Sequence, residues 1–177
     1  MLASRQNIFL IGLMAVGKTT VGRCLADELG MQFVDTDQVV EERAGADVSW
    51  IFDVEGEPGF RDREEHVVED LTQLSDIVLA TGGGVVLRPE NRRNLATRGI
   101  VIYLNTSIDR LVQRTRHDKR RPLLRGGNRE ALERLARERA PLYESIADYR
   151  FDADRTSAKA LAREIYTALQ KDEIVRG

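Results

Sequence analysis

The sequence has 177 residues, 42% of them hydrophobic, and carries a net charge of −2 at pH 7. This length favours one well-buried core and is short for two domains, so we expect a single domain over residues 1–177. The near-neutral charge excludes the global basic field that holds nucleic acid by its phosphates, so we expect no nucleic-acid partner and only local anion sites.

An apolar run at residues 8–11 predicts a strand covered on both faces, and residues 20–29 predict a helix. Residues 12–19 join them with the sequence Gly-Leu-Met-Ala-Val-Gly-Lys-Thr, which matches the phosphate-binding loop GxxxxGK[ST]. In such a loop Lys18 would reach the terminal phosphates of a nucleotide, and the Thr19 hydroxyl would bind Mg²⁺. The alternative is a tight turn between two core elements.

Residues 31–34 predict a second strand, which leads into Asp35, Thr36 and Asp37. Ligands of open α/β sheets bind at the carboxyl ends of strands. One carboxylate could therefore hold Mg²⁺ through water while the other orients or deprotonates an acceptor hydroxyl. The alternative is that Thr36 or Asp37 is only the N-cap of the following helix.

The segment over residues 38–74 has a helical pattern with several breaks. Gly45, Gly56, Pro58 and Gly59 divide it, so we expect several short helical pieces. We interpret the segment as a helical insertion beside the nucleotide-binding core.

A third strand is expected over residues 77–80, and it runs into Gly82, Gly83 and Gly84. These glycines either form a flexible turn or let a ligand approach the backbone closely. In the second case their N–H groups could donate to a phosphate or a substrate. A helix follows over residues 89–96.

The second half of the chain continues the alternation of strands and helices. We expect strands over residues 100–104 and 149–152, and helices over residues 109–115, 129–147 and 158–170. Pro141 should end or kink the helix that contains it. Strands that alternate with helices predict a parallel sheet with right-handed crossovers, an α/β fold.

Arginine supplies 23 of the 27 basic residues, and three arginines stand out by their context. Arg61 follows an aromatic residue after a turn, Arg139 precedes Pro141, and Arg121 lies in a basic segment at residues 114–125 that suits a mobile flap. Most arginines are solvated surface charges, so context alone leaves both a surface and a functional interpretation open.

The single cysteine, Cys24, excludes an internal disulfide and fits a reducing compartment. No apolar run approaches the roughly 18 residues of a membrane span, and the N-terminus lacks the apolar core of a signal peptide. We therefore expect a cytoplasmic protein without a membrane partner. Because no exposed apolar stripe argues for a protein partner, we expect a monomer.

With these motifs assembled, the chain resembles the shikimate kinases from about residue 8 to the C-terminal helix. The resemblance rests on six motifs in the order and approximate spacing of that family. They are the phosphate loop, Asp35-Thr36-Asp37, Ile51-Phe52 with Gly56-Glu57 and Phe60-Arg61, Thr81-Gly82-Gly83-Gly84, Arg121-Pro122-Leu123-Leu124 and Arg139-Ala140-Pro141-Leu142-Tyr143.

The resemblance implies a three-layer α/β/α P-loop fold with a five-stranded parallel sheet in the order 2-3-1-4-5. It also implies a helical substrate-binding region at about residues 33–61 and a lid at about residues 115–127. The implied reaction is transfer of the ATP γ-phosphoryl group to the 3-hydroxyl of shikimate, in the chorismate pathway to aromatic amino acids, with Mg²⁺ as cofactor.

The resemblance also implies residue roles. Asp37 is the candidate base, and Lys18 and Arg121 are the other catalytic residues. Thr19 and Asp35 serve the metal ion, Asp35 through its waters. The implied nucleotide-binding residues are Gly12, Ala15, Val16, Gly17, Lys18, Thr19, Thr20, Arg114, Arg121 and Arg155. The implied substrate-binding residues are Asp37, Phe52, Phe60, Arg61, Gly82, Gly83, Gly84 and Arg139.

The phosphate loop departs from the family pattern at one point. Ala15 stands where the family commonly has glycine, and Val16 where it often has a small residue. If position 15 needs positive φ, alanine is strained by about 1 kcal/mol or more. We expect the loop to close nonetheless, with an altered nucleotide affinity.

Two alternatives remain at this point. One is another small-metabolite P-loop kinase, similar to gluconate kinases, which would need no paired arginines for an aromatic-pathway carboxylate and lacks the Phe60-Arg61 context. The other is a nucleotide-dependent binding module. Against the latter, the sequence has no NKxD guanine-recognition motif, and such a module would leave the basic flap and the aspartate pair unexplained.

Overall fold

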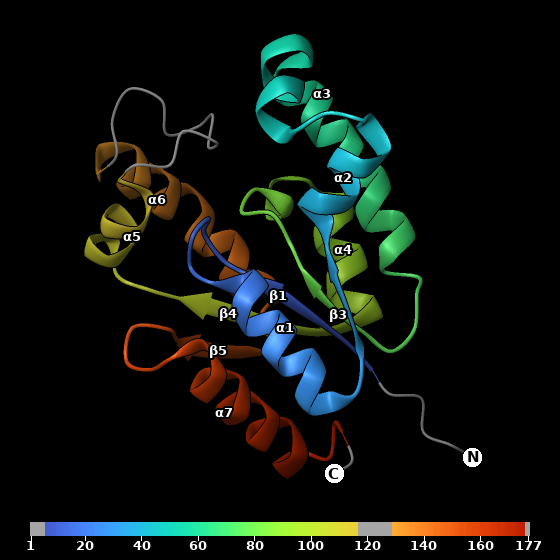
Figure 1. The fold of residues 1–177 in the computed structure, drawn as a ribbon, viewed down its shortest axis with the longest axis vertical. Helices are drawn as coiled ribbons and strands as arrows, with labels where there is room; N and C mark the ends of the chain where they lie inside the picture. Colours follow the sequence, from blue (N-terminus) through green and yellow to red (C-terminus); the bar gives the residue numbers. More distant parts are fainter. Residues whose placement is uncertain (1–5, 117–128, 176–177) are drawn as a thin grey trace.

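A computed structural model describes residues 6–116 and 129–175. Its centre is a five-stranded sheet in the order β2-β3-β1-β4-β5, and each of the neighbouring pairs is parallel (Figure 1). The strands are β1 (Asn7–Ile11), β2 (Gln32–Asp35), β3 (Ile77–Ala80), β4 (Gly99–Asn105) and β5 (Tyr149–Asp152). The expected strand order and parallel pairing are therefore confirmed.

Helices cover both faces of this sheet and complete three layers (Figure 1). They are α1 (Lys18–Leu29), α2 (Thr36–Ala44), α3 (Val48–Leu71), α4 (Pro89–Arg98), α5 (Ile108–Thr115), α6 (Arg129–Ile146) and α7 (Ala158–Lys171), with a short 3₁₀ helix, η1 (Val85–Leu87). None of the helices in the described ranges is long and apolar enough to cross a membrane.

The alternation of side chains along β1 divides the core in two. Phe9 and Ile11 face the cluster formed with α3, α4 and α6, whereas Ile8 and Leu10 face the cluster formed with α1 and α7. Successive side chains of a strand point to opposite faces, and a strand covered on both faces is apolar throughout. The uninterrupted apolar run in the sequence follows from this double burial.

The helical insertion agrees in part with the prediction of several pieces divided at Gly45, Gly56, Pro58 and Gly59. Gly45 ends α2 and Gly56 (φ 74°, ψ 176°) separates the two parts of α3, as predicted, but Pro58 and Gly59 do not divide the helix. Gly56 kinks the chain there. Pro58 comes two residues after the kink, in the first turn of the straight part, where its missing N–H has no helical acceptor to lose.

Pro141 likewise does not end its helix. Helix α6 continues to Ile146, and Tyr143, beyond the proline, is fully buried in the core next to the sheet. Tertiary packing of this last part stabilises the helix against the local preference of proline.

Candidate active site

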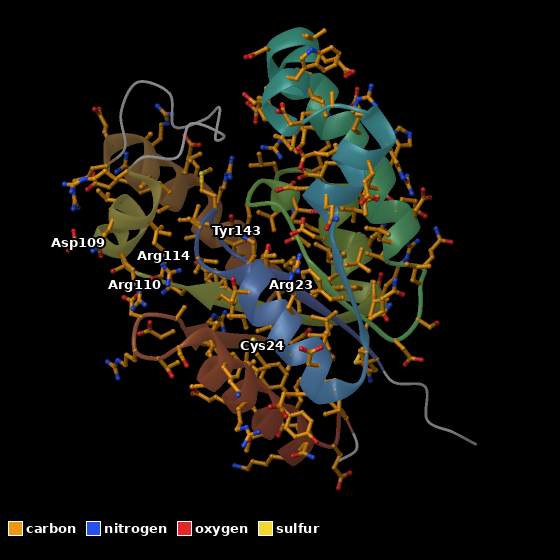
Figure 2. All side chains as sticks on the ribbon, viewed as in Figure 1. Arg23, Cys24, Asp109, Arg110, Arg114 and Tyr143 are labelled. Carbon is orange, nitrogen blue, oxygen red and sulfur yellow. The ribbon has the colours of Figure 1, made fainter. Side chains whose placement is uncertain are left out.

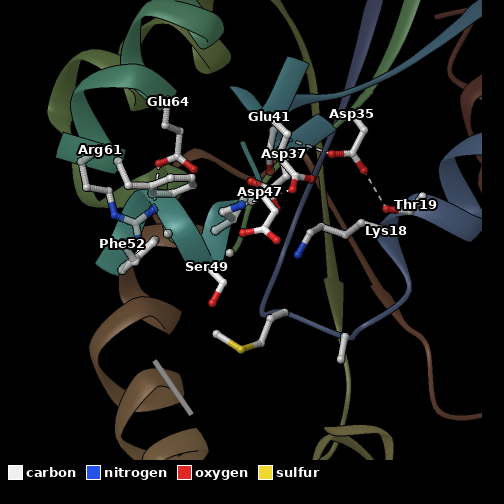
Figure 3. Close-up of a pocket in the computed structure, with 18 of the residues that line it drawn as sticks. Lys18, Thr19, Asp35, Asp37, Glu41, Asp47, Ser49, Phe52, Arg61 and Glu64 are labelled. Atoms are coloured by element: carbon white, nitrogen blue, oxygen red, sulfur yellow. Dashed lines mark hydrogen bonds and ion pairs between the residues drawn. The ribbon is translucent and has the colours of Figure 1, made fainter. Parts of the chain in front are cut away.

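A cavity of about 590 Å³ lies beyond the carboxyl ends of β1, β2 and β3 (Figure 3). Its walls come from the phosphate loop, from the starts of α1 and α2, from α3, from the glycine turn at residues 82–84, and from α5 and α6. The sequence-predicted site residues that line it are Ala15, Gly17, Lys18, Thr19, Thr20, Asp35, Asp37, Phe52, Phe60, Arg61, Gly82, Gly83, Gly84, Arg114 and Arg139.

Of the predicted site residues that the structure describes, three do not line the cavity. They include Gly12, the buried first residue of the loop, and Val16, which is buried in the core with α1 and α7. The side chain of Arg155 is 90% exposed and lies 3.9 Å from Asp152 Oδ2. Arg121 and most of the expected lid lie outside the described residues.

The phosphate loop is closed around its own lysine. Lys18 Nζ donates to the carbonyl oxygens of Gly12 and, at 2.8 Å, Leu13. Ala15 has φ 63°, so the condition under which alanine is strained at this position is met. The Arg114 guanidinium, carried by α5 (Figure 2), donates from Nη1 to the carbonyl oxygens of Ala15 and Val16, both at 3.0 Å.

Asp35 is the N-cap of α2, which corrects the assignment of that role to Thr36 or Asp37. Its Oδ1 accepts from the backbone N–H groups of Asp37 (2.9 Å) and Gln38 (3.3 Å), because β2 already ends at Asp35. Its Oδ2 accepts from the Thr19 hydroxyl at 2.9 Å (Figure 3). Two hard oxygen groups thus lie together at the start of α1.

This oxygen pair suits Mg²⁺, which prefers one or two protein oxygen ligands together with phosphate oxygens and water. In the part of the chain that the structure describes, no group of three His, Cys, Asp or Glu side chains could hold a metal ion. The donor set therefore fits an ion shared with a bound nucleotide better than an ion held by the protein alone.

Asp37 lines the cavity and is only partly exposed. Burial, followed by the neighbouring charges of Glu64 and Asp35, raises the pKa of its carboxyl group from 3.8 to about 7. Lys18 and Arg61 act in the opposite direction. A carboxyl group with this pKa can take up and release a proton near neutral pH.

Arg61 and Glu64 form a buried ion pair on α3. Arg61 Nη1 donates to Glu64 Oε1 at 2.9 Å, and Glu64 Oε2 has no partner within the described ranges. Burial raises the pKa of Glu64 above its usual value, although Arg61 opposes this. A β-carbon on Gly84 would lie 2.3 Å from Arg61 Nη2, so glycine makes room for the guanidinium.

The glycine turn differs in part from the prediction. The N–H of Gly82 donates to Thr36 Oγ1 at 3.0 Å, so this group serves the protein rather than a ligand. Sequence reasoning also gave no role to Glu64 or to Tyr143. The spacing of Arg61 and Glu64, three residues apart on a helix, was the one available signal for Glu64, and it indicates an ion pair without indicating its burial.

Arg139 and an aromatic pair complete the wall of the cavity. Arg139 is 2% exposed, and its Nε and Nη1 have no hydrogen-bond partner within residues 6–116 and 129–175. The rings of Phe52 and Phe60 lie 4.8 Å apart. Buried unpartnered donors beside an apolar wall can bind a ring compound that carries an anionic group.

Comparison with known proteins gives a consistent result. The sequence matches the profile of the shikimate kinase family over residues 14–170. It is 57% identical over 171 residues to the shikimate kinase of Vibrio parahaemolyticus serotype O3:K6, covering 96% of this chain and 99% of that protein. It is 58% identical over 165 residues to the shikimate kinase of Actinobacillus pleuropneumoniae serotype 5b, covering 93% of this chain and 95% of that protein.

A solved structure agrees with these relatives. Shikimate kinase from Acinetobacter baumannii, in complex with shikimate, superposes with a TM-score of 0.92 at 44% identity, over 94% of each chain. Relatives this similar over nearly the whole chain favour neither a gluconate kinase nor a binding module. The chain belongs to the shikimate kinase family, whose members are ATP-dependent kinases that act on a hydroxyl group.

Proposed function

We propose that the cavity binds ATP and shikimate side by side and that the protein phosphorylates the 3-hydroxyl of shikimate, giving shikimate 3-phosphate and ADP. The observation that carries this proposal is that a phosphate loop, an aspartate with a pKa of about 7 and two buried arginines open into one cavity. In this family the reaction serves the chorismate pathway to aromatic amino acids.

The nucleotide would occupy the loop side. Backbone N–H groups of the phosphate loop and the start of α1 bind the phosphates, and Lys18 exchanges its carbonyl partners for phosphate oxygens. Arg114 lies within reach of the nucleotide on the other side of the loop. For Arg121, Arg155 and the lid at about residues 115–127, the support is the family resemblance alone.

Thr19 and Asp35 would hold Mg²⁺, Thr19 through its hydroxyl and Asp35 through bound water. When bound, the ion neutralises charge on the β- and γ-phosphates. The 2.9 Å contact between the two side chains keeps both oxygens at the start of α1, next to the phosphate site. The Asp35 carboxylate is also fixed by its role as N-cap of α2.

The acceptor would occupy the helical side, within the substrate-binding region at about residues 33–61. Arg61 and Arg139 bind its carboxylate, because guanidinium groups match a carboxylate bidentately. Phe52 and Phe60 pack against its ring. The glycine turn, residues 82–84, allows the acceptor to approach the backbone closely.

Asp37 would act as the base. In its ionised form it accepts the proton of the acceptor hydroxyl while that oxygen bonds to the γ-phosphorus. The bond from the γ-phosphorus to the β,γ-bridging oxygen breaks, and its electron pair leaves with ADP. These residues all belong to one chain, so we propose that a monomer suffices.

A coupled assay of ADP release tests the proposed function. The purified protein receives ATP, Mg²⁺ and, in separate reactions, shikimate, gluconate and other polyol acids. We expect stimulation by shikimate alone. If gluconate or another polyol acid is phosphorylated and shikimate is not, the substrate assignment is wrong.

A further inference from the structure

Tyr143 connects helix α6 to the glycine turn. Its side chain is fully buried, its ring packs 5.1 Å from that of Tyr103, and its hydroxyl donates a hydrogen bond to the carbonyl oxygen of Gly83. Figure 2 shows Tyr143 on α6, inside the fold. Burial raises the pKa of this hydroxyl above its usual value, so it stays protonated and remains a donor throughout the neutral range.

Gly83 lies between the two halves of the site. A β-carbon at Gly83 would lie 3.1 Å from the backbone nitrogen of Met14, in the phosphate loop, and 3.3 Å from Arg139 Nη1. The backbone of Gly83 is therefore in close contact with the guanidinium of Arg139. Any movement of α6 relative to the glycine turn changes the place of that guanidinium.

Arg139 and Tyr143 are four residues apart on α6, so their side chains lie on the same face of the helix. The charge of Arg139 also lowers the pKa of Tyr143, against the effect of burial, as expected for close neighbours. Two of the guanidinium nitrogens of Arg139 have no hydrogen-bond partner within the described residues. A side-chain hydrogen bond with Arg139 also lowers the pKa of Tyr143, so the position of Arg139 depends on its contact with Tyr143 and on the placement of α6.

We propose that Tyr143 is a positioning residue for the acceptor. Its bond to Gly83 fixes α6 on the glycine turn and thereby holds Arg139 where it binds the acceptor's carboxylate. This inference rests on the proposed role of Arg139 and assigns the placement of that residue to a hydroxyl that never touches the substrate.

The test is Tyr143→Phe, which removes the hydroxyl and keeps the ring. We expect the KM for shikimate to rise about five- to tenfold, as for the loss of one buried hydrogen bond. The KM for ATP should stay within about twofold. Tyr103→Phe is the matched control, because it removes a hydroxyl from the same ring pair without touching Gly83, and it should leave both constants within about twofold.

A double-mutant cycle with Arg139→Ala completes the test. In the Arg139→Ala protein, adding Tyr143→Phe should not raise the KM for shikimate further. If Arg139→Ala alone leaves this KM unchanged, the proposed role of Arg139 fails. If Arg139→Ala raises it but Tyr143→Phe does not, or if the two effects multiply, only the inference about Tyr143 is overturned. The inference about Tyr143 is also overturned if the Tyr143→Phe protein does not fold, or if the substitution raises the KM for ATP as much as the KM for shikimate. Either result assigns the hydroxyl a purely structural role.

Discussion

Asp37 and Glu64 both point into the space left by the missing side chain of Gly82. A β-carbon on this glycine would lie 2.8 Å from Asp37 Oδ1 and 2.9 Å from Glu64 Oε2. The two carboxyl groups come from different helices, α2 and α3, and lie on the same wall of the cavity. The negative charge of Glu64 therefore acts directly on the proton affinity of Asp37.

The first prediction is a pH dependence set by this pair. A base must be ionised, so kcat/KM for shikimate should fall as pH decreases through about 7, the pKa of Asp37. Glu64→Gln removes a charge that raises the pKa of Asp37. The acidic limb of the pH profile, where kcat/KM falls, should therefore move to lower pH.

Rates measured between about pH 5.5 and 9 locate this limb. Glu65→Gln is the control, because Glu65 contacts Arg88 at 3.1 Å and does not line the cavity, so its limb should match that of the unmodified protein. Glu64→Gln also weakens the hold on Arg61, which changes KM, so the position of the limb is the decisive readout. A limb that stays near pH 7 in Glu64→Gln contradicts the assigned coupling.

The second prediction concerns stability. The folded protein raises the pKa of Asp37 from 3.8 to about 7, so above pH 7 folding must bury an unfavourable charge, at a cost of up to about 4 kcal/mol. This cost disappears as pH falls through 7 towards 4, because the folded state then binds the proton. Asp37→Asn should therefore abolish most turnover and yet raise the free energy of unfolding at pH 8 by at least about 1 kcal/mol.

Denaturant unfolding at pH 8 and pH 5 measures this difference. The gain from Asp37→Asn should be larger at pH 8 than at pH 5. Asp62→Asn serves as control, because Asp62 is exposed and pairs with Arg88 on the surface. A pH-independent gain, or a loss of stability at pH 8, is incompatible with a strongly raised pKa.

The third prediction separates two arginines on α3. Arg61→Lys loses the planar fork that a carboxylate requires, so the KM for shikimate should rise about 10- to 100-fold with little change in the KM for ATP. Arg63→Lys is the matched control, because Arg63 binds Glu55 at 2.7 Å away from the cavity. It should change either KM less than about twofold. Equal effects of the two substitutions would remove the special role of Arg61.

Local patterns in the sequence were sufficient for much of the fold and for the phosphate site. The apolar run of β1 and the motif at residues 12–19 depend on neighbours in the chain, and the structure agrees with both. The resemblance to a family added the strand order. The role of Asp35 as N-cap could not be predicted, because it depends on the residue at which β2 ends.

Glu64 and Tyr143 show why the rest of the site was missed. Each is an ordinary residue in its helix, and each gains its environment only when the helix packs against the glycine turn. The residues next to Glu64 in the sequence do not reveal that its carboxylate is buried. Those next to Tyr143 do not reveal that its hydroxyl bonds to a backbone carbonyl. Conversely, Arg155 was assigned to the nucleotide by resemblance, and its side chain points into solvent in this structure.

The last prediction concerns the unusual loop residue. Ala15 has φ 63°, and a loop that keeps this conformation when ATP binds carries the same strain in the free and bound protein, so the strain cancels from the binding free energy. Ala15→Gly should therefore change the KM for ATP less than about twofold, in place of the altered affinity expected from sequence. Arg114→Ala removes the two 3.0 Å bonds to the carbonyl oxygens of Ala15 and Val16, and should raise the KM for ATP about tenfold or more. Both constants come from initial rates at saturating shikimate, with Arg116→Ala as control, since Arg116 does not line the cavity. A clear gain in ATP affinity for Ala15→Gly means that the loop changes conformation when the nucleotide binds, because only then does the strain enter the binding step.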